Sequence, residues 1–266
     1  MRQLSKLPKA PARFLVVDWK LWLGWPLLWY GIIRRLAHEQ RKRQTGPYLR
    51  ILFGEAGRRG DPWGGLTLEI NGELFHFGAG IKRWPEFHDG NGNLTAAGKQ
   101  ALGHGLPGHL SDSIDWRWVQ DEVDLSWKTG FRSKVEIASY FRGLRNNSIA
   151  LPKFQSRSWA RRYKQAMLPG HHNCTTIILE QLRLASSINV EQGMPLPAFN
   201  TLVHLAGKKR TPADNELNYF LSLPEAAIES QLRELATGHD EPDWNLLAKG
   251  VIPIPDWLNW SSLKLP

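Results

Sequence analysis

Residues 63–81 read "WGGLTLEINGELFHFGAGI" and contain the strongest turn signal of the chain. Apolar and polar residues alternate around Asn71-Gly72, a dipeptide typical of the two-residue turn of a β-hairpin. We therefore predict a β-hairpin over this stretch. Upstream, residues 47–57, "PYLRILFGEAG", have the same extended character and predict another strand.

Helical patterns lie downstream of the hairpin. Ser133 and Glu136 match a capping box, and an apolar face follows from Val135 through Ala138, Phe141 and Leu144. Residues 175–185 predict a second helix. A third lies in "SLPEAAIESQLRELATG" and ends at Gly238.

The stretches between these elements carry turn signals. Residues 88–115 are rich in Gly, Asn, His and Asp and predict a long surface loop. "GMPLPAF", residues 193–199, predicts a Pro-bearing connection, and the tail from Asp240 predicts an irregular surface path.

These elements predict an α+β fold in which a small antiparallel sheet packs on helices. We expect three parts. Residues 1–46 form a Trp-rich basic helical segment, residues 47–190 form a core, and residues 191–266 form a C-terminal helical extension packed on that core.

Composition limits the function classes. The chain has 266 residues, of which 42% are hydrophobic and 22% charged, so it is globular and long enough for a substantial core. A single cysteine excludes an intrachain disulfide framework and Cys-rich zinc motifs. We expect no cofactor and no metal, because "HDGNGNLTAAGK" lacks the carboxylate ladder of a calcium loop.

The net charge of +9 favours an anionic partner. Basic clusters such as "RSWARRYK" could hold nucleic acid, but such clusters are most often solvated faces and no nucleic-acid module is present. We therefore consider nucleic acid an unlikely partner and an anionic phospholipid membrane the better one.

The N-terminal segment favours a membrane interface through aromatic residues spaced three to four apart: Trp19, Trp22, Trp25 and Trp29. The apolar run 21–33 is too short for a bilayer, which needs about 20 residues. Basic residues follow it, namely Arg34, Arg35, Arg41, Lys42 and Arg43. Two interpretations stay open: a helix lying in an anionic membrane interface, or an amphipathic helix packed on the protein with a solvated basic face.

Cys174 lies in "PGHHNCTTIILEQL", residues 169–182, where a loop becomes an apolar helix. The unpaired N–H groups of a helix N-terminus favour the thiolate over the thiol, which makes Cys174 a candidate nucleophile. Its polar neighbours are candidates for supporting or substrate-binding roles: His171, His172, Asn173 and Thr175. The alternative is an inert, buried packing cysteine.

A hairpin first, then a capped helix, then "NCTT" opening an apolar helix resembles the circularly permuted papain-fold cysteine hydrolases of the NlpC type. This group includes relatives of lecithin retinol acyltransferase and desumoylating-type peptidases. The resemblance covers roughly residues 47–187 and includes the "FGAGI" that closes the hairpin. It implies a permuted papain-like fold, a nucleophilic Cys174 and a histidine base from an early strand.

The sequence departs from this family at the expected base. Many members carry that histidine at the start of the first hairpin strand, where this chain has Trp63-Gly64-Gly65. His76 on the second hairpin strand is the best remaining partner for Cys174, since an imidazole can take the thiol proton and later return it. The alternative for His76 is a half-buried, hydrogen-bonded structural histidine.

The resemblance implies acyl transfer to water through a thioester on Cys174. With the Trp-rich segment it favours phospholipid acyl esters as substrates. Peptidoglycan or peptide amides are the alternative, and a catalytically inactive fold used for membrane or partner binding is another. Related permuted enzymes serve as type VI secretion toxins. That relationship predicts synthesis in the bacterial cytoplasm without a signal peptide, export to a target-cell membrane, and an immunity protein or secretion component as partner.

Overall fold

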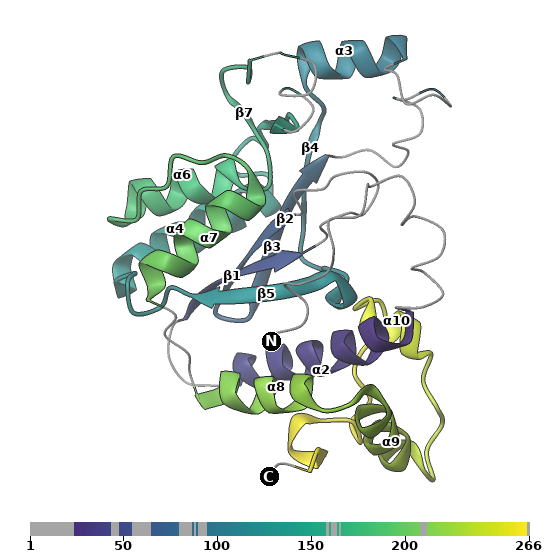
Figure 1. Cartoon of the computed structure of the whole chain (residues 1–266). Helices are drawn as coiled ribbons and strands as arrows, with labels where there is room; N and C mark the ends of the chain where they lie inside the picture. The colour runs from purple at the N-terminus through teal and green to yellow at the C-terminus, as the bar shows by residue number, and fades with distance from the viewer. Residues whose placement is uncertain are drawn as a thin grey trace. The chain divides into compact units, whose positions relative to one another are not determined.

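The computed structural model describes residues 24–43, 48–54, 65–79, 87, 89, 95–157, 160, 164, 166–207 and 212–264. Over these residues the fold is α+β with a five-stranded antiparallel sheet, as the sequence predicts (Figure 1). The chain forms two compact units. Unit 1 takes its residues from 1–46, 114–119 and 209–266, and unit 2 from 47–113 and 120–208.

The sheet belongs to unit 2 and has the strand order β4-β3-β2-β1-β5. The strands are β1 (Leu49–Gly54), β2 (Gly65–Ile70), β3 (Glu73–Ala79), β4 (Gly108–Ser111) and β5 (Val119–Asp124). The predicted hairpin is confirmed as β2–β3. Its turn residues Asn71 and Gly72 have φ values of 51° and 82°, the left-handed conformation that a type I′ turn requires.

One face of the sheet carries the core of unit 2. Alternate residues of β1, β2 and β3 are buried there against α4 (Phe131–Arg145), α6 (Thr176–Ala185) and α7 (Pro195–Ala206). Phe53 stacks on Phe199 of α7 at 5.1 Å between ring centroids, and Phe75 packs on Phe141 of α4 at 5.3 Å. The packing of α6 on the sheet also positions Cys174, which lies at the start of this helix.

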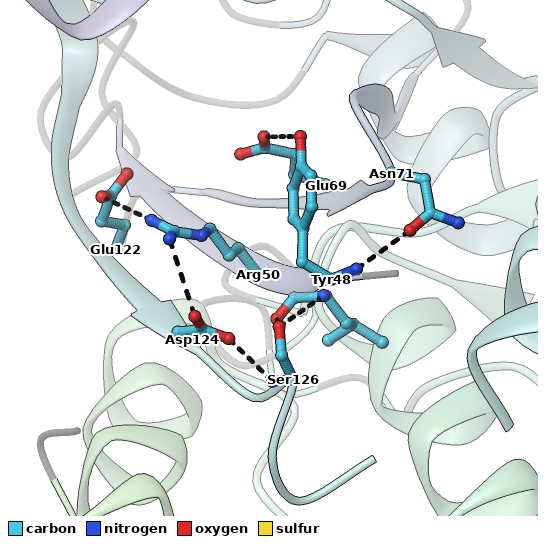
Figure 2. A network of polar contacts seen from close by, with 8 residues as sticks. Tyr48, Arg50, Glu69, Asn71, Glu122, Asp124 and Ser126 are labelled. Carbon is cyan, nitrogen blue, oxygen red and sulfur yellow. Dashed lines mark hydrogen bonds and ion pairs between the residues drawn. The ribbon is translucent and has the colours of Figure 1, made fainter. Parts of the chain in front are cut away.

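The opposite face of the sheet carries a network of polar contacts among residues that are largely buried (Figure 2). Arg50 of β1 lies opposite Glu69 of β2 and pairs with Glu122 at 3.1 Å and Asp124 at 3.6 Å, both on β5. The Tyr48 hydroxyl donates to Glu69 at 2.8 Å. Charged groups therefore bind β1 to its two neighbouring strands on this face.

Two small elements complete unit 2 near the site. β6 (Lys153–Phe154) and β7 (His171–His172) pair in parallel. α3 (Ala96–His104) is capped by Thr95, whose hydroxyl accepts the Gly98 N–H at 3.1 Å.

Three sequence predictions are corrected in this unit. Residues 88–115 contain α3 and β4 and are not one long loop. α7 begins at Pro195, inside the predicted connection, because proline is tolerated in the first turn of a helix. α4 begins at Phe131 after Gly130, ahead of the predicted capping box at Ser133.

Unit 1 is helical. It contains α2 (Gly24–Lys42), η4 (Trp116–Trp118), α8 (Pro212–Ser222), α9 (Glu225–Ala236), α10 (Trp244–Ala248) and η5 (Trp260–Ser262). Gly31 lets α2 approach η4 closely, since a Cβ there would lie 2.9 Å from the Arg117 backbone nitrogen. α9 confirms the helix predicted before Gly238, while α10 and η5 lie in the tail predicted to be irregular.

Trp29 and three arginines of α2 are buried, whereas Lys42 at the end of the helix is exposed. Trp29 has no exposed surface and packs edge-on against Trp244 at 5.3 Å, so it is a core residue of unit 1 and not a surface residue. Arg34, Arg35 and Arg41 are buried, which overturns the prediction of a solvated basic face at these positions. The Arg35 guanidinium donates to the Leu247 carbonyl oxygen at 2.6 Å, and burial lowers the pKa of Arg35.

The predicted C-terminal extension 191–266 is divided between the two units. α7 contributes Ala198, Phe199 and Leu202 to the core of unit 2, whereas helices from α8 onward bury their apolar residues with α2. Among the described residues, no helix has both the length and the apolar character needed to cross a membrane. Trp19, Trp22 and the side chain of Trp25 lie outside the described part of the chain.

Candidate functional site

Asn173 builds the turn that carries Cys174. Its buried side-chain oxygen accepts the N–H groups of Thr175 and Thr176, both at 2.8 Å, and the Thr176 hydroxyl accepts the Asn173 N–H at 2.9 Å. This reciprocal pattern is that of a capping box. The Asn173 side-chain nitrogen donates to the Gly193 carbonyl oxygen at 3.0 Å, which ties the turn to the chain before α7.

Cys174 therefore occupies the first turn of α6, since the helical bond from the Ile177 N–H to the Asn173 carbonyl oxygen spans it. Cys174 is only partly buried, unlike a core cysteine. Thr175 is fully buried and its hydroxyl lies 3.8 Å from the Cys174 sulfur. The predicted helix at 175–185 is confirmed, with its described start at Thr176.

His76 projects from β3 on the polar face of the sheet, because its neighbours Phe75 and Phe77 enter the apolar core on the other face. Its Nδ1 lies 2.9 Å from the Thr67 hydroxyl oxygen. When Nδ1 carries the proton and donates it to Thr67, Nε2 is an acceptor. That tautomer is the one a general base for a thiol needs.

Gly65 links His76 and Cys174. A Cβ on Gly65 would lie 3.7 Å from His76 Cε1 and 3.8 Å from Cys174 Sγ, so the two side chains flank one methyl-sized space. The structure thus brings together the two residues that the sequence proposes as a dyad. Gly64, where we expected the base to be missing, lies outside the described residues, and Gly65 opens β2 at the site.

His171 and His172 have other contacts. Both ring nitrogens of His171 face backbone carbonyl oxygens, Nδ1 that of Pro169 at 3.0 Å and Nε2 that of His104 at 3.2 Å. His172 Nε2 lies 3.5 Å from a Glu180 carboxylate oxygen, and its Nδ1 lies 3.5 Å from the Thr176 hydroxyl. Through these contacts the His171 ring lies against the C-terminal end of α3, and the His172 ring lies against the side of α6.

The contact between Thr67 and His76 was not predicted, although the sequence contains its signal. A two-residue turn at 71–72 places residue 70 opposite residue 73 and, by the same count, residue 67 opposite residue 76. A hydroxyl directly opposite a strand histidine on the same face is therefore readable from the hairpin register.

No group of three or more His, Cys, Asp and Glu side chains in the described parts of the chain is placed to hold a metal ion. The chain matches no protein-family model, no curated protein and no solved structure in the comparisons made. The functional argument therefore depends on the geometry around Cys174.

Proposed function

We propose that this protein is a thiol-dependent acyl hydrolase in which Cys174 is the nucleophile, His76 is the general base and Thr67 positions His76. The observation that carries this proposal is that His76 and Cys174 flank the same space beside Gly65. The hydrogen bond between Thr67 and His76 adds a third group that orients the base.

The chemistry takes place in two steps. His76 Nε2 accepts the proton of Cys174 while the sulfur attacks the acyl carbonyl carbon, and the protonated imidazole then gives this proton to the leaving alcohol or amine. Water, deprotonated by His76, next attacks the thioester carbonyl. This releases the carboxylic acid and returns the proton to Cys174.

The first turn of α6 supports the charge that develops in both steps. Asn173 engages the N–H groups of Thr175 and Thr176, so we assign the stabilisation of the oxyanion to the backbone N–H of Cys174 and the positive end of the helix dipole. A sheet hairpin that carries the base and a later helix that carries the thiol are consistent with a permuted papain-like fold, which is part of the proposal.

We propose a phospholipid acyl ester as the substrate, with peptidoglycan or peptide amides as the alternative. The buried Trp29 and the buried arginines of α2 remove part of the original argument for a membrane substrate. Exposed apolar side chains of unit 2 near the start of α4 favour a membrane substrate independently. Delivery by a secretion machine and an immunity partner remain predictions.

The test compares wild type, Cys174→Ala and His76→Ala. Each is incubated with vesicles of phosphatidylethanolamine and phosphatidylglycerol, with peptidoglycan fragments, and with a soluble short-chain thioester. Released fatty acid, lysolipid, peptide and thiol are followed by mass spectrometry and absorbance. His204→Ala, an exposed histidine of α7, is the matched control.

We expect release by wild type and His204→Ala only, and its loss after alkylation of wild type with iodoacetamide. Activity that survives Cys174→Ala would overturn the assignment of Cys174 as the nucleophile. Activity that is lost in Cys174→Ala but retained in His76→Ala would overturn the assignment of His76 as the general base. Release of peptide without release of fatty acid or lysolipid would show that the substrate is an amide and not a phospholipid ester.

A further inference from the structure

A cluster of apolar side chains lies on the surface where α4 begins. Trp127 is 47% exposed, Phe131 68% and Val135 44%, and Phe131 and Val135 are one helical turn apart. We call these three residues the α4 patch. Single exposed apolar residues are ordinary in soluble proteins, whereas three around the start of one helix are a candidate interaction surface.

The α4 patch adjoins the buried face of its helix. α4 buries Ile137, Ala138, Phe141 and Leu144 in the core of unit 2. Phe131 and Val135 are exposed and lie at the edge of that buried face, since at about 100° per residue they stand about 20° and 60° from Ala138 around the helix axis. The core contact of α4 therefore does not require an aromatic residue at position 131.

Two exposed cations, Lys128 and Arg132, and one exposed carboxylate, Glu136, lie beside the α4 patch. The Lys128 ammonium lies 4.7 Å from the centre of the Trp127 ring, and Arg132 is exposed beside Phe131 and paired with Glu136 at 2.9 Å. The first turn of α4 contains no acidic residue, and its N-cap Gly130 has no side chain to cap it. The positive end of the helix dipole therefore adds to the charge of Lys128 and Arg132.

We propose that the α4 patch docks unit 2 on an anionic lipid surface. Trp127 and Phe131 would enter the interfacial layer, and Lys128 and Arg132 would face headgroup phosphates. Trp and Phe beside Lys and Arg are typical of interfacial membrane contacts, and the net charge of +9 favours an anionic surface. The role of this docking in lipid hydrolysis rests on the proposed function, whereas docking itself does not require Cys174.

The test measures sedimentation of the full chain with vesicles of phosphatidylcholine, with and without phosphatidylglycerol. The variants are Trp127→Ser with Phe131→Ser, and Lys128→Gln with Arg132→Gln. Leu184→Ser is the matched control, because Leu184 of α6 is 64% exposed in the same unit and lies outside the patch.

We expect wild type to bind the phosphatidylglycerol vesicles, and the double serine variant to bind at least about tenfold more weakly. Each neutralised cation should weaken binding about fivefold, and Leu184→Ser should bind like wild type. Equal binding by wild type and the double serine variant would overturn the proposal. A self-association of wild type without lipid that the double serine variant lacks would also overturn it, since the patch would then contact protein.

Two further arms separate docking from catalysis. Cys174→Ala should bind vesicles like wild type, and the double serine variant should hydrolyse the soluble thioester like wild type. Loss of both thioester hydrolysis and vesicle binding in the double serine variant would indicate a folding defect. Phe131→Ala, which shortens one exposed side chain, then decides: unchanged vesicle binding by this variant overturns the proposal.

Discussion

Thr67 Oγ1 lies 2.9 Å from His76 Nδ1, one residue pair beyond Leu68 and Phe75 in the β2–β3 ladder. Both residues belong to rigid strands, so the imidazole is held by the sheet and not by a loop. In the tautomer whose Nδ1–H donates to Thr67, Nε2 has the acceptor role that the proposed reaction needs.

Thr67→Val should lower kcat for thioester hydrolysis by about five- to tenfold, because one net hydrogen bond of about 1 kcal/mol orients the ring. Valine keeps the shape of the buried side chain, and Thr67→Ser keeps the hydroxyl. Steady-state kinetics should show rescue by serine and an altered pH dependence of kcat in the valine variant. Equal kinetics for Thr67→Val and wild type would mean that this hydrogen bond does not position a base.

Gly65→Ala should fold normally, since its methyl group would lie at ordinary contact distances from His76 and Cys174. It should lower kcat on the order of 100-fold, because it fills the space in which the thiol and imidazole must approach the acyl group. Gly103→Ala is the control, since nothing lies within 4 Å of the added Cβ there. Wild-type turnover in Gly65→Ala would show that the reaction does not use this space.

Asn173→Ala should destabilise unit 2 by about 2–4 kcal/mol, because it removes a helix cap and leaves the Gly193 carbonyl oxygen without its donor. It should also slow the alkylation of Cys174 by iodoacetamide, as the first turn of α6 loses its order. Urea unfolding and alkylation rates measure the two effects. Asp243→Ala removes the cap of α10 in unit 1 and should cost about 1 kcal/mol with no change in thiol reactivity.

Arg50→Met should destabilise the protein by about 3–5 kcal/mol, because Glu122 and Asp124 would lose the buried cation between them. Arg132→Met breaks an exposed pair in the same unit and should cost at most about 0.5 kcal/mol. Denaturant unfolding of both variants gives the comparison. Similar losses of unfolding free energy in the two variants would show that the buried ion pairs stabilise the protein no more than the exposed pair does.

Tyr140 should make stability fall at alkaline pH. Burial, and secondarily the Glu180 carboxylate, raise the pKa of Tyr140, so the folded state holds this proton more tightly than the unfolded state does. Its contribution is fully present below the unfolded pKa of about 10 and is lost as the pH rises through the folded value. Tyr140→Phe should reduce this loss between pH 9 and 11, as measured by urea unfolding at each pH.

Local signals explain the elements that the sequence predicted correctly. The Asn71-Gly72 turn requires two left-handed residues in succession, which few other dipeptides supply. α7 was missed because Pro195 and Pro197 were interpreted as a connection, yet both lie in the first turn of the helix, where proline costs little. α3 was missed because Gly98 and Gly103 lower its helix propensity.

Val135 shows why a pattern of three-residue steps overestimates a buried face. A step of three residues turns the helix by about 300°, which is about 60° short of a full turn. Apolar residues at every third position, here 135, 138, 141 and 144, therefore move gradually around the helix axis. Ala138, Phe141 and Leu144 meet the core, whereas Val135 is 44% exposed. The same drift leaves Val135 within the α4 patch.

For the candidate site, the sequence supplied Cys174 and His76 because each carries its own chemistry. It could not assign a role to His171, since the direction of this side chain depends on the His104 carbonyl oxygen, 67 positions earlier, which only the fold brings near. The burial of Trp29 was equally unreadable, because its partner Trp244 lies 215 positions later in the chain.

The division of the chain also sets an order of folding during synthesis. All the described strands and helices of the sheet unit have been made once α7 is complete at Ala206, whereas α2 must wait for α8, α9 and α10 to cover Trp29, Ile32 and Leu36. A ribosome adds about 5–20 residues per second, so this apolar helix stays uncovered for at least about ten seconds after it emerges. The nascent chain therefore offers chaperones a binding segment at its beginning that the finished protein conceals.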